Sequence, residues 1–196
     1  MLTFPAALAL ALLAVPLVTT LFHYGQFSAH DVWMTRNAVV AYSIGLTGLI
    51  LVKILAPGFY AQQNIKTPVK IGVITLLVTQ SLNCMLVFPL QHAGLALATG
   101  LGACFNAAFL FYKLRSYDIY QPQFGWVIFF AKLCVALVVM AGVLWWFSGD
   151  TASWLIMPTH SKLLKLAMLV ALGVAAYFGT LALLGFRVRD FARRGA

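Results

Sequence analysis

Long apolar runs alternate with short polar segments along the whole chain. Six of these runs are long enough to cross a bilayer as helices, because about 20 helical residues span the hydrocarbon core. They cover approximately residues 4–22, 36–57, 68–88, 93–112, 125–147 and 162–186. No internal repeat or low-complexity tract separates them. The pattern therefore predicts an all-α integral membrane protein with six transmembrane helices in one helical unit.

The first run, "MLTFPAALALALLAVPLVTTLF", has two interpretations. A cleaved signal peptide also contains an apolar stretch, but this run lacks a basic start, is longer than the usual apolar region, and is followed by further apolar runs. A membrane helix is therefore the favoured interpretation. Pro16 lies inside this run and is expected to kink the helix or to end it early.

The composition excludes a soluble fold. Hydrophobic residues make up 63% of the chain and charged residues 9%, whereas about a quarter of the residues of a soluble domain are charged. Helices in a bilayer satisfy their own backbone and can expose apolar side chains to lipid. The net charge of +9 does not indicate nucleic-acid binding, because the basic residues stand at the ends of apolar runs and form no basic face.

Residues that hold metals or form disulfides show no suitable pattern. Cys84, Cys104 and Cys134 each lie inside an apolar run and are interpreted as small buried hydrophobic residues. The four histidines have no partner at i+4, so no metal site is predicted. The four acids are aspartates far apart in the sequence, which disfavours a magnesium-dependent prenyl transferase. We predict neither a cofactor nor a catalytic residue.

The basic residues predict the orientation of the helices. With a cytoplasmic N-terminus, eight of the thirteen lysines and arginines fall on the cytoplasmic side and three on the outer side. The positive-inside rule then favours both termini in the cytoplasm. The segment "THSKLLK" is an exception, because His160, Lys162 and Lys165 cluster on the outer side.

The segment between the second and third runs, "LVKILAPGFYAQQNIKTPVKIG", is predicted to be a helix exit, a cytoplasmic loop and a helix entry. Pro57 removes a backbone donor and Gly58 permits a turn, so the second helix is expected to end there. Thr67 is expected to cap the next helix, with Pro68 at its first position.

Three segments resemble the MurJ (MviN) family of lipid II flippases. They are "KILAPGFYAQQNIKTPVKI" (53–71), "FPLQHAGLALATGLGACFNA" (88–107) and "LLGFRVRDFARR" (183–194). The first is the most specific, since its Lys, Ala-Pro, Phe-Tyr and Thr-Pro elements occur in order. The similarity runs over essentially the whole chain and matches the last six of the family's fourteen helices, so the first eight have no counterpart here.

The resemblance implies a transporter of the MOP superfamily with a MATE-like bundle, in which two lobes rock about a central cavity. Residues 1–120 would supply four helices of the C-terminal lobe, and residues 121–196 two additional helices that form a lipid groove and carry a basic cytoplasmic tail. The implied cargo is lipid II, an undecaprenyl diphosphate bearing the peptidoglycan precursor, moved across the bacterial inner membrane without covalent chemistry. The implied partners are membrane lipids and the missing eight helices.

Two other functions fit the same sequence. Small residues and uncharged polar residues on the third and fourth runs would also suit a membrane scaffold or accessory subunit. An exporter of another polyprenyl-linked sugar, or of a drug, is the alternative among transporters.

Lys53 and Lys132 are the candidate substrate-binding residues, because a charge within a membrane span invites a functional hypothesis. Either ammonium could attract a diphosphate. The simpler interpretation is that each side chain extends along apolar surface toward the headgroups and fixes the topology. Lys53 is placed about one turn from the end of the second run.

Thr79, Asn83 and Thr99 are the candidate remnant of an ion site. Thr79 and Asn83 are four residues apart and therefore share one helix face. The resemblance implies that some relatives hold sodium between the matching helices and one from the missing half. None of the three is a carboxylate, so interhelical hydrogen bonding is the simpler role.

The last two runs contain almost no polar side chains. Their small and large apolar residues could line a groove for a polyprenyl chain or could simply face lipid, and the resemblance favours the groove. Trp145, Trp146 and Trp154 are predicted to form an aromatic belt at the outer boundary.

Overall fold

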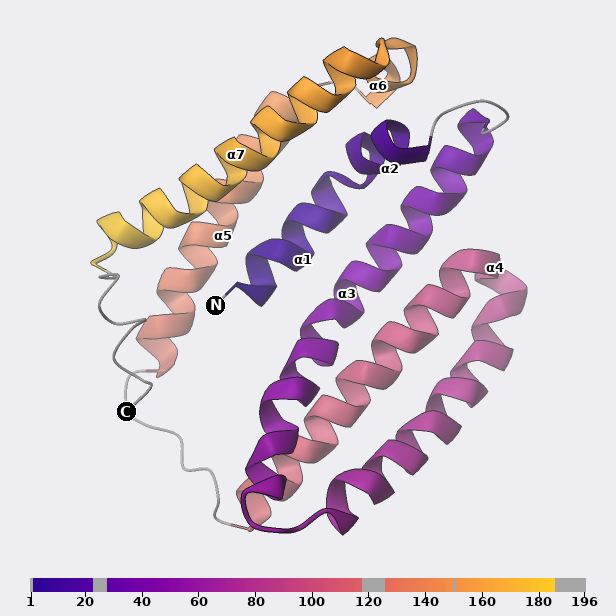
Figure 1. Ribbon diagram of the computed structural model, residues 1–196, viewed down its shortest axis with the longest axis vertical. Coiled ribbons are helices and arrows are strands. Elements are labelled where there is room, and N and C mark those ends of the chain that lie inside the picture. The colour runs from indigo at the N-terminus through magenta and orange to yellow at the C-terminus, as the bar shows by residue number, and fades with distance from the viewer. Residues whose placement is uncertain (1, 23–27, 118–125, 150, 186–196) are drawn as a thin grey trace. The chain divides into compact units, whose positions relative to one another are not determined.

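The computed structural model describes residues 2–22, 28–117, 126–149 and 151–185, and these residues are almost entirely helical. The helices are α1 (Thr3–Leu12), α2 (Ala14–Phe22), α3 (Ala29–Tyr60), α4 (Lys66–Ser116), α5 (Trp126–Ser148), α6 (Thr151–Ile156) and α7 (Thr159–Leu183), coloured by residue number in Figure 1. The expected all-α fold is confirmed.

Four of these helices, α3, α4, α5 and α7, are long and apolar enough to cross a membrane, and the bent pair α1–α2 raises the number to five. Helix α4 has 51 residues and is non-helical at Gln91, where it folds back on itself (Figure 1). Its two halves correspond to the third and fourth predicted spans. The number of six crossings itself stays a prediction.

The chain forms two compact units. One contains residues 1–20 and 123–196, and the other contains residues 21–122. The first 20 residues therefore belong with α5 and α7, whereas the sequence-based division grouped all residues up to 120. That division concerned function and remains a proposal.

The break between α1 and α2 confirms the expected effect of Pro16. The two helices are bent by 69° around Leu13, which adopts a non-helical conformation. A proline cannot donate to the carbonyl four residues earlier, and its ring crowds that carbonyl. For Pro16 that carbonyl belongs to Leu12, so the chain turns immediately afterwards.

The ends of α3 differ from the prediction. Ser28 and Asp31 form a capping box, which starts the helix at Ala29 rather than at residue 36. At the other end Pro57 is accommodated within the helix, which ends at Tyr60. The left-handed residue of the following turn is Gln63, with φ 56°, and not Gly58.

The start of α4 also corrects a prediction. The side-chain oxygen of Asn64 accepts a hydrogen bond from the backbone N–H of Thr67, at 3.2 Å. Asn64 thus supplies the capping group that was expected from Thr67. The helix begins at Lys66, and Pro68 lies in its first turn, where a missing N–H leaves no hydrogen bond broken.

Helices α3 and α4 pack through glycines. A Cβ atom at Gly100 would lie 2.9 Å from the Cα atom of Gly45, and one at Gly48 would lie 2.8 Å from the carbonyl carbon of Ala103. These positions bring the two backbones into direct contact, as small residues do between membrane helices.

The core of the other unit is built from α1, α5, α6 and α7. Its buried side chains include Leu133 and Met140 of α5, Trp154 of α6 and Leu169 of α7. Trp154 is 0% exposed, whereas Trp145 and Trp146 are 77% and 79% exposed. The expected aromatic belt is therefore wrong for Trp154, which packs inside the unit.

Candidate functional site: an apolar pocket between α1, α5 and α7

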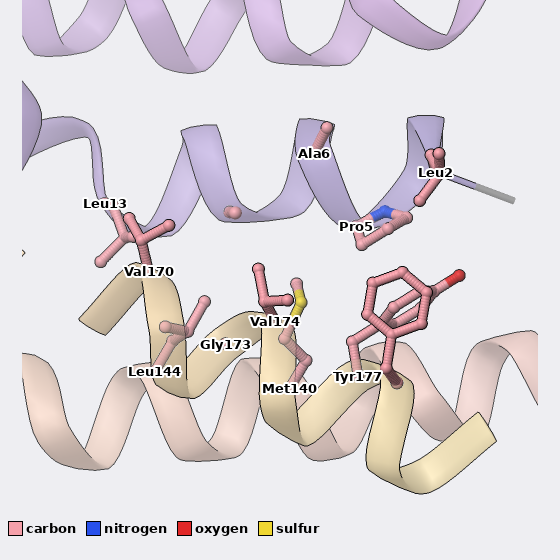
Figure 2. Close-up of a pocket in the computed structure, with 12 residues that line it drawn as sticks. Leu2, Pro5, Ala6, Leu13, Met140, Leu144, Val170, Gly173, Val174 and Tyr177 are labelled. Atoms are coloured by element: carbon pink, nitrogen blue, oxygen red, sulfur yellow. The ribbon is translucent and has the colours of Figure 1, made fainter. Parts of the chain in front are cut away.

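A pocket of about 360 Å³ lies within the unit formed by α1, α5 and α7. Figure 2 shows side chains of α1 pointing toward those of α7, with α5 closing the far wall. The lining residues are Leu2, Pro5, Ala6, Ala9, Leu13, Met140, Leu144, Val170, Gly173, Val174, Tyr177 and Phe178. Tyr177 is the only one with a polar side-chain atom besides the sulfur of Met140, so the pocket suits an apolar ligand.

The pocket owes its depth to small residues. Gly173 is buried in the middle of α7, and a Cβ atom there would lie 3.1 Å from the side chain of Leu144. Ala6 and Ala9 contribute little volume from the facing α1. A larger side chain at any of these positions would reduce the space.

The pocket is open along α7. Val170, Val174 and Phe178 recur every four residues, so they share one face of the helix. They are 46%, 51% and 44% exposed, which places them at the rim. An apolar chain entering here could exchange its contacts with lipid for contacts with the protein.

Lys132 holds the far ends of α5 and α7 together. Its ammonium group donates a hydrogen bond of 2.8 Å to the carbonyl oxygen of Leu184, the C-cap residue of α7. A cation at a helix C-terminus satisfies a carbonyl that has no partner within the helix. This contact gives Lys132 a structural role, and its suggested contact with a lipid headgroup stays a prediction.

Lys53 lies on an exposed part of α3. Because α3 continues to Tyr60, Lys53 is about two turns from the helix end, not one. Its exposure is consistent with a side chain that extends toward the headgroups. Its suggested role in diphosphate binding is also untested.

The three candidate ion-site residues are not joined by hydrogen bonds among the described residues. Thr79 lies against Gly102 of the returning half of α4. The side-chain oxygen of Asn83 is buried and has no partner within the part of the chain that is described. Thr99 is exposed, and its hydroxyl donates to the carbonyl of Leu95 at 2.9 Å. Thr99 therefore bonds within its own helix, and sodium binding remains a hypothesis.

The sequence did not reveal the contribution of α1 to the pocket. The groove was expected from the last two runs alone, but one wall comes from residues 2–13. The alternating Leu and Ala residues of "PAALALALL" were a possible signal. They gave no indication of which distant helix they would face.

These features define a multi-pass α-helical membrane protein with an apolar groove. A family model described as "Lipid II flippase MurJ" matches residues 1–168. The chain therefore belongs to the lipid II flippase MurJ family.

Curated relatives agree with this assignment. The chain is 49% identical over 192 residues to "Lipid II flippase MurJ" of Burkholderia cenocepacia, an alignment that covers 97% of this chain and 37% of that protein. It is 39% identical over 186 residues to "Probable lipid II flippase MurJ" of Vibrio cholerae, covering 95% of this chain and 35% of the relative. The chain thus spans little more than a third of the length of these relatives.

Proposed function

We propose that this chain contributes part of the C-terminal lobe and a lipid-tail groove to a transporter that moves lipid II across the bacterial inner membrane. The apolar pocket between α1, α5 and α7 is the observation that carries this proposal. Lipid II has a polyprenyl tail, and such a tail can exchange its contacts with bilayer lipid for close van der Waals packing in an apolar pocket. The proposed transport requires no covalent step.

The proposal also assigns the partners and the orientation. The diphosphate and sugars would occupy a central cavity completed by helices from the part of the relatives that this chain does not span, and alternating exposure of that cavity would move the cargo. Both termini would be cytoplasmic. The basic residues on that side would then face the anionic surface of the inner leaflet.

Val174→Trp tests the groove. Val174 lines the pocket and is half exposed, so the indole can fill the opening without entering the core. We expect binding of a fluorescent undecaprenol to the chain in nanodiscs to weaken about tenfold, which corresponds to ~1.4 kcal/mol, because the indole occupies the opening and removes van der Waals contacts between the tail and the pocket.

Val138→Trp is the matched control. Val138 is 71% exposed and does not line the pocket. The Val138→Trp variant should bind undecaprenol with the same affinity as the unmodified chain. Equal affinities for all three proteins would contradict the groove.

Transport itself is tested in cells depleted of their own lipid II flippase. The chain is expressed alone or together with the first eight helices of the Burkholderia cenocepacia relative. Growth in the second case supports the flippase proposal. Failure in both cases favours a scaffold or accessory role.

A further inference from the structure

Lys162 occupies an unusual position at the beginning of α7. It is 4% exposed and belongs to the same buried side of α7 as Leu169, Gly173 and Tyr177. The buried face of α7 is therefore largely apolar, but in its first turn this face carries a lysine. Among the described residues the structure shows no hydrogen bond from this ammonium and no acid beside it. The ammonium nitrogen itself is not among the buried polar atoms without a partner, so the enclosed stem leaves the charge accessible, where it can bind an anion.

Lys165 lies one turn further along the same helix. Its ammonium nitrogen is 4.8 Å from the ring centroid of Trp154, and it would be 3.5 Å from a Cβ atom at Gly149. The indole N–H of Trp154 donates to the carbonyl of Ser148 at 3.0 Å, and this bond fixes the ring. The C-terminal end of α5 and helix α6 thus hold the ammonium of Lys165 near the start of α7.

The two lysines lie beyond one end of the pocket. Leu13, Leu144 and Val170 mark that end in Figure 2. Lys165 and Lys162 precede Val170 by five and eight residues, which is about 8 and 12 Å along the helix. Side chains on a helix lean toward its N-terminus, so both stems extend away from the pocket. An apolar groove followed by two cations matches an amphiphile with an anionic head.

We propose that Lys162 and Lys165 bind the diphosphate of a polyprenyl diphosphate lipid whose tail lies in the groove between α1, α5 and α7. The tail contact rests on the proposed function, whereas the headgroup contact is an additional assignment. In the proposed orientation this site is at the outer face, so it receives the lipid after it has crossed. It also gives a reason for the basic residues that depart from the positive-inside rule.

Binding to the full chain in nanodiscs tests the site with two probes, undecaprenyl diphosphate and undecaprenol. The test variant is Lys162→Met/Lys165→Met, which removes both charges and keeps long side chains. We expect the affinity for undecaprenyl diphosphate to fall about tenfold or more, because charge-assisted hydrogen bonds to phosphate are lost. The affinity for undecaprenol should not change.

Thermal unfolding separates this role from a structural one. Replacing each lysine by methionine keeps the packing of its stem, so the melting temperature should stay nearly unchanged. A melting temperature that falls together with the affinity for both lipids would show that the lysines only support the fold, and would overturn the proposal. Lys66→Met/Lys70→Met, which removes two charges from α4, is the matched control and should bind both lipids normally.

Two further arms separate the alternatives. Asp150 stands in the sequence between these segments but lies outside the described residues. Asp150→Asn should leave both the diphosphate affinity and the melting temperature unchanged, whereas a lower melting temperature together with stronger diphosphate binding would show that the lysines form an internal ion pair, and would overturn the proposal. An excess of phosphatidylglycerol that displaces undecaprenyl diphosphate with equal affinity would show an ordinary phospholipid site and overturn the proposal. Normal undecaprenol binding with an unaffected diphosphate affinity would refute the lysine site alone, whereas failure to bind either probe would refute the groove as well.

Discussion

Single glycines decide how closely α3 and α4 approach. A Cβ atom at Gly45 would overlap the backbone of Gly100, so no rotation of a side chain can relieve the clash. We expect Gly45→Ala to lower the free energy of unfolding by about 1–3 kcal/mol, the usual penalty for overpacking. Thermal unfolding in detergent measures the change.

Gly72→Ala is the control for this prediction. Gly72 also lies within a helix of the same unit, but nothing stands within 4 Å of an added Cβ atom there. The substitution should be neutral or slightly stabilising, because alanine is a better helix former than glycine. If both variants unfolded like the unmodified chain, the close packing of α3 on α4 would be wrong.

Gln91 carries backbone strain at the reversal of α4. Its φ of 48° and ψ of −125° belong to a region that favours glycine. We expect Gln91→Gly to raise the free energy of unfolding by about 1 kcal/mol. Gln80→Gly, in the helical part of the same element, should lower it by a similar amount. A loss of stability at both positions would argue against the turn.

At the scale of the helices, the attachment of the end of α7 to α5 depends on the hydrogen bond from Lys132 to Leu184. A hydrogen bond from a charged donor contributes about 1.5–3 kcal/mol. Lys132→Met should therefore destabilise the end of α7, and hydrogen exchange of the amides near residues 180–184 should become faster. Lys53→Met makes the same change at an exposed lysine and should not affect exchange in α7. Unchanged exchange in the Lys132 variant would refute the capping role.

The elements also show how far the sequence alone could predict the structure. The lengths of the apolar runs correctly predicted the helices and the interruption at residues 89–92, and Pro16 correctly predicted the break between α1 and α2. These features depend on local chemistry, which the sequence contains. The burial of Trp154 and the hydrogen bond from Lys132 to Leu184, 52 residues away, depend on tertiary contacts that periodicity does not contain. The pocket was missed in part for the same reason, since its α1 wall lies far from α7 in the chain.

At the scale of the whole molecule, the account depends on the path of the chain through the membrane. Four helices satisfy the criteria for a span by length and composition, or five with the bent pair. The proposed six crossings require that α4 crosses twice and reverses at Gln91. The flippase proposal then places the basic loops inside and the two lysines of α7 outside.

Single-cysteine labelling of intact and permeabilised cells tests this path most directly. The three native cysteines are replaced by alanine, and one cysteine is introduced at Gln62, Gln91, Ser116 or Ser161, all exposed. A membrane-impermeant maleimide should label Gln91→Cys and Ser161→Cys in intact cells that have a permeable outer membrane. Gln62→Cys and Ser116→Cys should react only after the inner membrane is opened. Labelling of Gln91→Cys on the same side as Gln62→Cys and Ser116→Cys would contradict the double crossing of α4 and with it the proposed orientation.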